Sequence, residues 1–181
     1  YIGRDYLLID GANEEVAVDW LSKRECIIAK PNYGAAGVGI EKIDIDGSNI
    51  HSILEYLKQN KLDLIEDYIQ QHHSMNNINS SSVNSIRIIT VQNGDKIDII
   101  SAILRMGVGK HVDNFSSGGI AAPVDLVTGK VFKPAVTKTG SEVYYNHPVT
   151  GTQIVGFEIP YWKETVKMIY EVGMIVPEVK T

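Results

Sequence analysis

Residues 27–40 read IIAKPNYGAAGVGI, a short apolar run that ends in Lys30 and passes into a loop rich in glycine. Gly34, Gly37 and Gly39 lie in this loop, with only alanine and valine between them. Such a backbone can approach a ligand closely because few side chains stand in its way. Its N–H groups suit a phosphate, and a lysine on the adjoining strand adds a positive charge. The stretch therefore predicts either a phosphate-binding loop or a glycine-rich hairpin that holds no ligand.

The residues that flank the glycines exclude two common nucleotide motifs. Lys30 precedes the glycines, whereas the lysine of a P-loop follows them and opens a helix. A dinucleotide fingerprint needs a helix after the loop, but residues 41–46 alternate in polarity as a strand does. We therefore expect a strand–loop–strand unit, an arrangement in which a glycine loop can fold down over a nucleotide.

Composition and charge narrow the class of protein. Of the 181 residues, 44% are hydrophobic and 22% charged, which is ordinary for a soluble protein. The net charge of −5 and the lack of a basic run argue against nucleic acid as a partner. The sequence shows no apolar stretch of membrane-spanning length and no secretory signal, so we expect a cytoplasmic protein without membrane insertion. The single cysteine, Cys26, lies in an apolar run and is expected to be a buried hydrophobe.

Hydrophobic periodicity predicts an α+β unit over residues 1–70, made of a leading helix and a lobe that carries the glycine loop. Asn13 is the expected cap of the first helix. The expected elements, in order, are a helix at 13–23, strands at 26–30 and 39–45, a helix at 50–60 and a strand at 62–69.

Residues 71–181 are predicted to form a second unit built on an antiparallel sheet. Residues 70–85 are polar and without periodicity, which indicates a connection rather than an element. Asn93-Gly94 between two strand-like runs, 86–92 and 95–104, is a strong hairpin signal. The remaining expected elements are a hairpin around Thr128-Gly129 and a last helix that starts at Pro160 and ends at Gly173.

Two arginines lie on the predicted hairpin, Arg87 on its first strand and Arg105 at the end of its second. Each can be a surface cation at a sheet edge or part of an anion-binding site. With a two-residue turn at Asn93-Gly94, Arg87 lies opposite Ile100, and Arg105 faces the other way. Convergence of both arginines on one anion therefore requires a β-bulge, or an Arg105 that lies beyond the strand end.

Taken in order, the lysine-ended strand, the glycine loop, the segment Glu66-Asp67-Tyr68-Ile69 and the arginine-bearing hairpin resemble the ATP-grasp superfamily. The closer resemblance is to the subgroup associated with sugar transfer and polysaccharide biosynthesis, through residues 82–87 (SVNSIR), 103–107 (ILRMG) and 113–115 (DNF). The hairpin is also similar to that of the glutamate-ligase-like members. The resemblance covers nearly the whole chain and implies an α+β ATP-grasp fold, two lobes with the nucleotide site between them.

The resemblance also implies which residues hold the nucleotide. Lys30 would contact the ATP phosphates or the adenine. The three loop glycines, Gly34, Gly37 and Gly39, would form a mobile lid over the phosphates. The adenine edge would be held by Glu66 and by the backbone of Asp67, Tyr68 and Ile69.

A second set of residues would serve the acceptor. Arg87 and Arg105 would bind the transferring phosphoryl group or the carboxylate that receives it. The residues implied to lie where the substrate meets the phosphate are Asp113, Asn114, Gly118 and Gly119.

The activity that the resemblance implies is that of an ATP- and Mg²⁺-dependent carboxylate–amine ligase acting on small molecules in surface polysaccharide biosynthesis. A carboxylate attacks the γ-phosphate, and an amine then displaces the resulting acyl phosphate. A phosphotransferase and a non-catalytic nucleotide-binding or scaffold module remain alternatives. The family's magnesium ligands, an acidic residue and a Glu-X-Asn motif, do not follow the last expected helix. We therefore expect these ligands beyond Thr181 and the second lobe to be incomplete.

Overall fold

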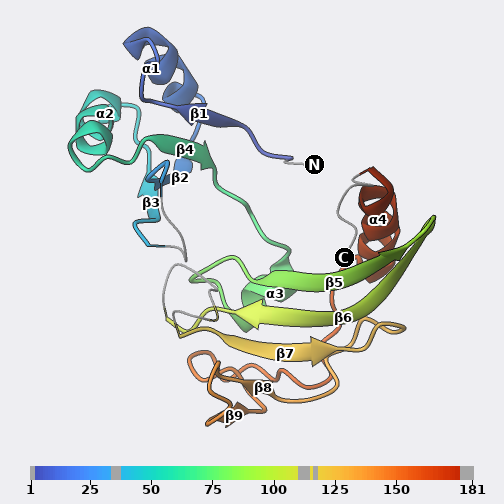
Figure 1. Cartoon of the computed structure of the whole chain (residues 1–181). Coiled ribbons are helices and arrows are strands. Elements are labelled where there is room, and N and C mark those ends of the chain that lie inside the picture. Colours follow the sequence, from blue (N-terminus) through green and yellow to red (C-terminus); the bar gives the residue numbers. More distant parts are fainter. Residues whose placement is uncertain (1–2, 34–37, 110–114, 116–117, 176–181) are drawn as a thin grey trace. The chain divides into compact units, whose positions relative to one another are not determined.

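The computed structural model describes residues 3–33, 38–109, 115 and 118–175, and the chain divides into two compact units, Tyr1–Gln70 and Gln71–Thr181 (Figure 1). Each unit has its own antiparallel sheet and its own helices. The predicted α+β class is therefore confirmed. Of the predicted site residues, Gly34, Gly37, Asp113 and Asn114 lie outside the described residues.

Unit 1 is a four-stranded antiparallel sheet with two helices, in the strand order β1-β4-β2-β3 (Figure 1). Its elements are β1 (Tyr6–Leu8), α1 (Glu14–Ser22), β2 (Cys26–Lys30), β3 (Glu41–Asp44), α2 (Ile50–Gln59) and β4 (Leu64–Asp67).

The hydrophobic core of unit 1 lies between one face of the sheet and the two helices. It combines Ile27, Ala29 and Ile65 of the strands with side chains such as Leu21 of α1 and Leu57 of α2. Because side chains alternate along a strand, the residues between these buried positions point to the opposite face. We call this opposite face, which carries Lys30 and Glu66, the open face of unit 1.

Asn13 caps α1 as predicted, because its side chain accepts a hydrogen bond from the N–H of Glu15 at 3.0 Å. This bond satisfies one of the N–H groups that a helix leaves unpaired at its start.

Unit 2 contains a five-stranded antiparallel sheet in the order β5-β6-β7-β8-β9, with two helices. Its elements are α3 (His73–Ile78), β5 (Ser85–Asn93), β6 (Lys96–Met106), β7 (Ile120–Val124), β8 (Ala135–Val136), β9 (Val143–Tyr144) and α4 (Trp162–Ile175). The long hairpin of β5 and β6 dominates the sheet (Figure 1). One face of β6 and β7 supplies Ala102, Leu104, Ala122 and Val124 to the core.

The prediction that residues 70–85 form only a connection is wrong, because α3 lies within them. His72 caps this helix by accepting a hydrogen bond from the N–H of Ser74 at 3.3 Å. Met75 and Ile78, three residues apart, are both buried in the core of unit 2. Two apolar residues among polar ones gave too weak a periodic signal for a helix.

The last helix also differs from its prediction at both ends. It begins at Trp162, not at Pro160, because Tyr161 has a φ of +55°, outside the helical region. It also continues through Gly173. A Cβ at this glycine would lie 2.9 Å from the side chain of Ile97, so the glycine permits close packing of α4 on β6.

Candidate functional site

Lys30 and Glu66 lie together on the open face of unit 1. Glu66 is opposite Ile28 of β2 on one side and Tyr6 of β1 on the other, and Lys30 is opposite Leu64. This register brings Lys30 Nζ to 2.7 Å from Glu66 Oε1. Glu66 is only 7% exposed, so its carboxylate depends on nearby cations for compensation.

A third charge joins this pair from a segment that the sequence analysis did not single out. Arg4 Nη2 lies 2.9 Å from Glu66 Oε2, so the two carboxylate oxygens face different cations. Two cations on one carboxylate leave a net charge of +1 on this part of the open face. Arg4 lies two residues before Tyr6 in the sequence. This position predicts a contact between Arg4 and Glu66 only once Tyr6 is known to pair with Glu66.

The side chain of Asp67 stabilises unit 1. Arg24 Nε lies 2.6 Å from Asp67 Oδ1, and the N–H of Asp5 donates to Asp67 Oδ2 at 2.9 Å. Burial opposes ionisation of this carboxyl, but the hydrogen bonds from Arg24 and Asp5 outweigh it and lower the pKa of Asp67. The N–H of Asp67 itself donates to the carbonyl of Asp5 at 3.0 Å. The predicted backbone donors for adenine must therefore come from Tyr68 or Ile69.

Tyr68 and Ile69 follow the last residue of β4. Ile69 is 41% exposed, and the ring of Tyr68 lies 4.9 Å from Lys42 Nζ. Lys42 is opposite Ile28 in the sheet and so shares the open face with Glu66. The predicted adenine segment therefore has an apolar side chain and an aromatic ring beside the charged cluster.

Gly39 closes the base of the glycine loop against Pro31. It has a φ of +76°, and a Cβ there would lie 3.0 Å from Pro31 Cγ. Both the backbone conformation and the close contact favour glycine at this position. The loop thus starts and returns next to the end of β2, where Lys30 lies.

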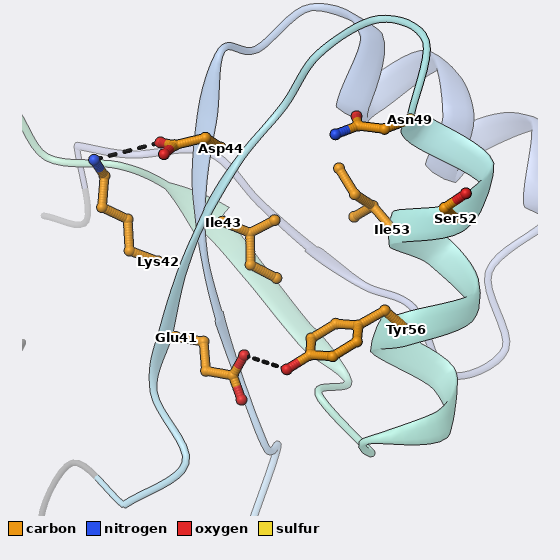
Figure 2. Close-up of a pocket in the computed structure, with 8 residues that line it drawn as sticks. All are labelled: Glu41, Lys42, Ile43, Asp44, Asn49, Ser52, Ile53 and Tyr56. Carbon is orange, nitrogen blue, oxygen red and sulfur yellow. Dashed lines mark hydrogen bonds and ion pairs between the residues drawn. The ribbon is translucent and has the colours of Figure 1, made fainter.

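A groove of about 420 Å³ lies elsewhere in unit 1, between β3 and α2. In Figure 2, Glu41 and Ile43 point toward α2, whereas Lys42 and Asp44 point away from it. Tyr56 donates to Glu41 Oε2 at 2.7 Å across the groove, and this hydrogen bond raises the pKa of Tyr56. None of the predicted nucleotide residues lines the groove.

In unit 2, a β-bulge brings the two predicted arginines to one face of the sheet. Ile89 pairs with Ser101 but Thr90 pairs with Ile99, so Ile100 is an extra residue on β6. As a result Arg87 is opposite Ile103, not Ile100, and Arg105 is opposite Ser85. Both arginines therefore point away from the core face. The β-bulge that was expected to be necessary for their convergence on one anion is thus present.

The turn of this hairpin is Gly94-Asp95, one residue later than predicted, because Asn93 pairs with Lys96. Gly94 takes the positive φ of +60° that a tight hairpin turn needs.

A buried histidine ties the end of β6 to a distant loop. His147 is 1% exposed, and its Nε2 lies 2.8 Å from the carbonyl oxygen of Gly107, two residues after Arg105. Its Nδ1 accepts from the N–H of Thr150 at 3.3 Å. Because Nδ1 is an acceptor, Nε2 carries the proton and donates to Gly107. His147 therefore stabilises the backbone that follows Arg105.

The backbone before Arg87 is also anchored by a buried side chain. Asn84 Nδ2 donates to the carbonyl of Met75 at 3.0 Å and to that of Asn79 at 2.9 Å. The N–H of Asn84 donates to Gln71 Oε1 at 2.9 Å. These bonds fix the start of β5 to α3. Asn84 belongs to the family motif at residues 82–87, but this structural role was not predicted from the sequence.

Gly118 and Gly119 lie directly before β7, whose first residue Ile120 is opposite Met106 of β6. Gly118 has a φ of +99°, and among the described residues no atom lies within 4 Å of a Cβ built on it. The two glycines are therefore next in the sheet to the end of the strand that carries Arg105.

The part of the chain that the structure describes holds no group of three histidine, cysteine, aspartate or glutamate side chains suited to a metal ion. The magnesium ligands expected beyond Thr181 remain a prediction. Among the helices within the described residues, none is both long and apolar enough to cross a membrane.

Comparisons with known proteins identify the family. The model of the family described as sugar-transfer associated ATP-grasp matches residues 14–181. Searches among curated proteins and among solved structures gave no match. The match spans both units, including Lys30, Glu66 and the two arginines. The chain therefore belongs to the sugar-transfer associated ATP-grasp family, as its motifs predicted.

Proposed function

We propose that this chain is the ATP-binding domain of a cytoplasmic carboxylate–amine ligase that acts through an acyl phosphate in surface polysaccharide biosynthesis. Its substrates are ATP, a small-molecule carboxylate and an amine. The family assignment supports ATP as the nucleotide. The acyl-phosphate route is our proposal for how this chain uses it.

The observation that carries the proposal is the Lys30–Glu66–Arg4 cluster at the base of the glycine loop. The cluster has a net charge of +1, and it belongs to the same unit as the two ends of the glycine loop. The cluster and the loop can therefore bind the same phosphate. Lys30 is 26% exposed and can reach a ligand, whereas the Glu66 side chain is 9% exposed. A partly exposed cation beside a loop of small residues suits a triphosphate.

Arg87 and Arg105 support the acceptor half of the proposal. A carboxylate oxygen that attacks the γ-phosphorus forms a new P–O bond, and ADP leaves as the old one breaks. The amine nitrogen then attacks the acyl carbon, phosphate leaves, and the amine loses a proton to solvent. Two guanidinium groups on one sheet face would offset the charge of the carboxylate and of the transferring group.

Mg²⁺ supplies charge neutralisation at the phosphates when it is bound to such enzymes. Hard oxygen ligands would hold it. The described residues hold no group of three histidine, cysteine, aspartate or glutamate side chains suited to a metal ion, so we assign no step to the ion.

Calorimetric titration of a non-hydrolysable ATP analogue with Mg²⁺ tests the nucleotide site. We expect the Lys30→Ala variant to bind at least about tenfold more weakly than the wild type, because a charge-assisted contact to phosphate is lost. Lys23→Ala is the matched control, since Lys23 is exposed and pairs with Asp19 at 2.6 Å on the surface of α1. Equal affinity of the wild type and Lys30→Ala, both folded, would contradict the proposal.

Product analysis separates the proposed reaction from its alternatives. A ligase releases ADP and phosphate together with a new amide. A phosphotransferase releases ADP and leaves the phosphoryl group on the acceptor. Binding without turnover would favour the non-catalytic module.

A further inference from the structure

Arg4 is a second cation on the carboxylate of Glu66, in addition to Lys30. Its guanidinium contacts Glu66 Oε2 at 2.9 Å, while Lys30 contacts Glu66 Oε1 at 2.7 Å. Arg4 lies before residue 14, where the family match begins. Nothing in the family assignment therefore gives this residue a role.

Lys30 cannot serve Glu66 and a phosphate equally well with one ammonium group. A lysine that turns toward a phosphate weakens its contact with the carboxylate. The side chain of Glu66 is only 9% exposed, so water compensates it poorly. A buried carboxylate without a cation is strongly destabilised, and this cost would be subtracted from nucleotide affinity.

Arg4 is placed to carry this charge alone. A guanidinium presents several N–H donors in a planar fork and can bind both oxygens of one carboxylate. It reaches Glu66 from the segment that precedes β1, whereas Lys30 reaches it from β2, on the other side of β4. Two further charged groups of this face within the described residues, Lys42 and Asp44, pair with each other at 3.4 Å.

We infer that Arg4 is a positioning residue, which keeps Glu66 compensated and oriented while Lys30 turns to the nucleotide phosphates. The inference rests on the proposed nucleotide site and deepens it. Arg4 acts through Glu66 and does not itself touch the nucleotide. This predicts that Arg4 matters for ligands with phosphates and only while Glu66 is charged.

Five variants test the inference by titration with the non-hydrolysable ATP analogue. We expect Arg4→Gln to weaken binding about tenfold, which corresponds to about 1.4 kcal/mol. Arg4→Lys restores most of the affinity because it keeps a cation beside Glu66. In the Glu66→Gln background, adding Arg4→Gln changes affinity little, because no charge remains to compensate. Lys58→Gln, which removes an exposed ion pair of 3.1 Å with Glu14, is the control and binds as the wild type does.

Adenosine, titrated by NMR, gives the readout that a merely structural role would not produce. Because adenosine has no phosphate, Lys30 stays on Glu66, and Arg4→Gln leaves its affinity unchanged. Equal loss for adenosine and the ATP analogue would overturn the inference and indicate general damage to unit 1. If Arg4→Gln weakened binding of the ATP analogue as much in the Glu66→Gln background as it does when Glu66 is present, the inference would also be overturned. Such a result would indicate that Arg4 contacts the nucleotide directly.

The outcomes also separate this inference from the proposed function. If Lys30→Ala weakens binding but Arg4→Gln does not, the nucleotide site stands and the role of Arg4 is wrong. If the folded wild type binds no ATP analogue, both are wrong.

Discussion

Substitution of Gly129 by alanine is expected to lower the stability of unit 2 through a clash with one side chain, that of Trp162. Gly129 lies in the turn after β7 with a φ of +71°, and a Cβ there would fall 2.3 Å from Trp162 Cγ. Trp162 opens α4, is 7% exposed, and donates from Nε1 to the carbonyl of Leu126 at 3.1 Å. The ring therefore cannot move aside without losing its hydrogen bond. We expect Gly129→Ala to destabilise unit 2 strongly.

Gly140 offers a matched control for this change. It has a φ of +69°, almost that of Gly129, but no atom of the described residues lies within 4 Å of a Cβ built on it. Gly140→Ala therefore costs only the left-handed backbone penalty, about 1–2 kcal/mol. Gly129→Ala adds overpacking against Trp162, about 1–3 kcal/mol. The expected totals are about 1–2 kcal/mol for the control and about 2–5 kcal/mol for Gly129→Ala.

Urea unfolding followed by tryptophan fluorescence measures the difference. The chain has two tryptophans, Trp20 in unit 1 and Trp162 in unit 2. In a Trp20→Phe background the signal comes from Trp162 alone, and the reference carries the same background. Equal free energies of unfolding for Gly129→Ala and Gly140→Ala would refute the packing of Trp162 on this turn.

Two further predictions concern Asp67 and His147. Asp67→Asn is expected to lower the free energy of unfolding of unit 1 at pH 7. Because the folded state lowers the pKa of Asp67, its stabilisation is present above the ordinary aspartate pKa of about 3.9 and is lost as the pH falls below it. Urea unfolding at several pH values should therefore show the gap between variant and wild type closing in acid, and a gap independent of pH would contradict this. His147→Ala should cost about 2–4 kcal/mol, since it removes buried hydrogen bonds and leaves a cavity. His51→Ala, an exposed histidine, should stay within about 0.5 kcal/mol of the wild type in the same assay, and similar values for both variants would argue against the tie to Gly107.

The elements with a strong local signal were predictable from sequence. The lysine-ended strand, the Asn13 cap and the long hairpin each follow from periodicity or from residue types with one dominant conformational preference. The family followed from the order of these motifs rather than from any one of them.

The features that were missed depend on pairing between distant segments. The extra residue Ile100 follows Ile99, and this doubled isoleucine breaks the alternation along β6 but does not by itself show a bulge that aligns Arg87 with Arg105. Gly173 was read as the end of a helix because its packing against Ile97 is not visible in the local sequence. Arg4 could be linked to Glu66 only through the register of β1 on β4.

Hydrogen exchange with and without a saturating ATP analogue tests the central claim, that the open face of unit 1 binds the nucleotide. Mass spectrometry of the peptides locates the backbone amides that the ligand protects. We predict slower exchange at residues 28–30, up to Lys30, and at residues 66–69, with little change in α1 or α2. Protection confined to other segments, with none at these two, would contradict the account.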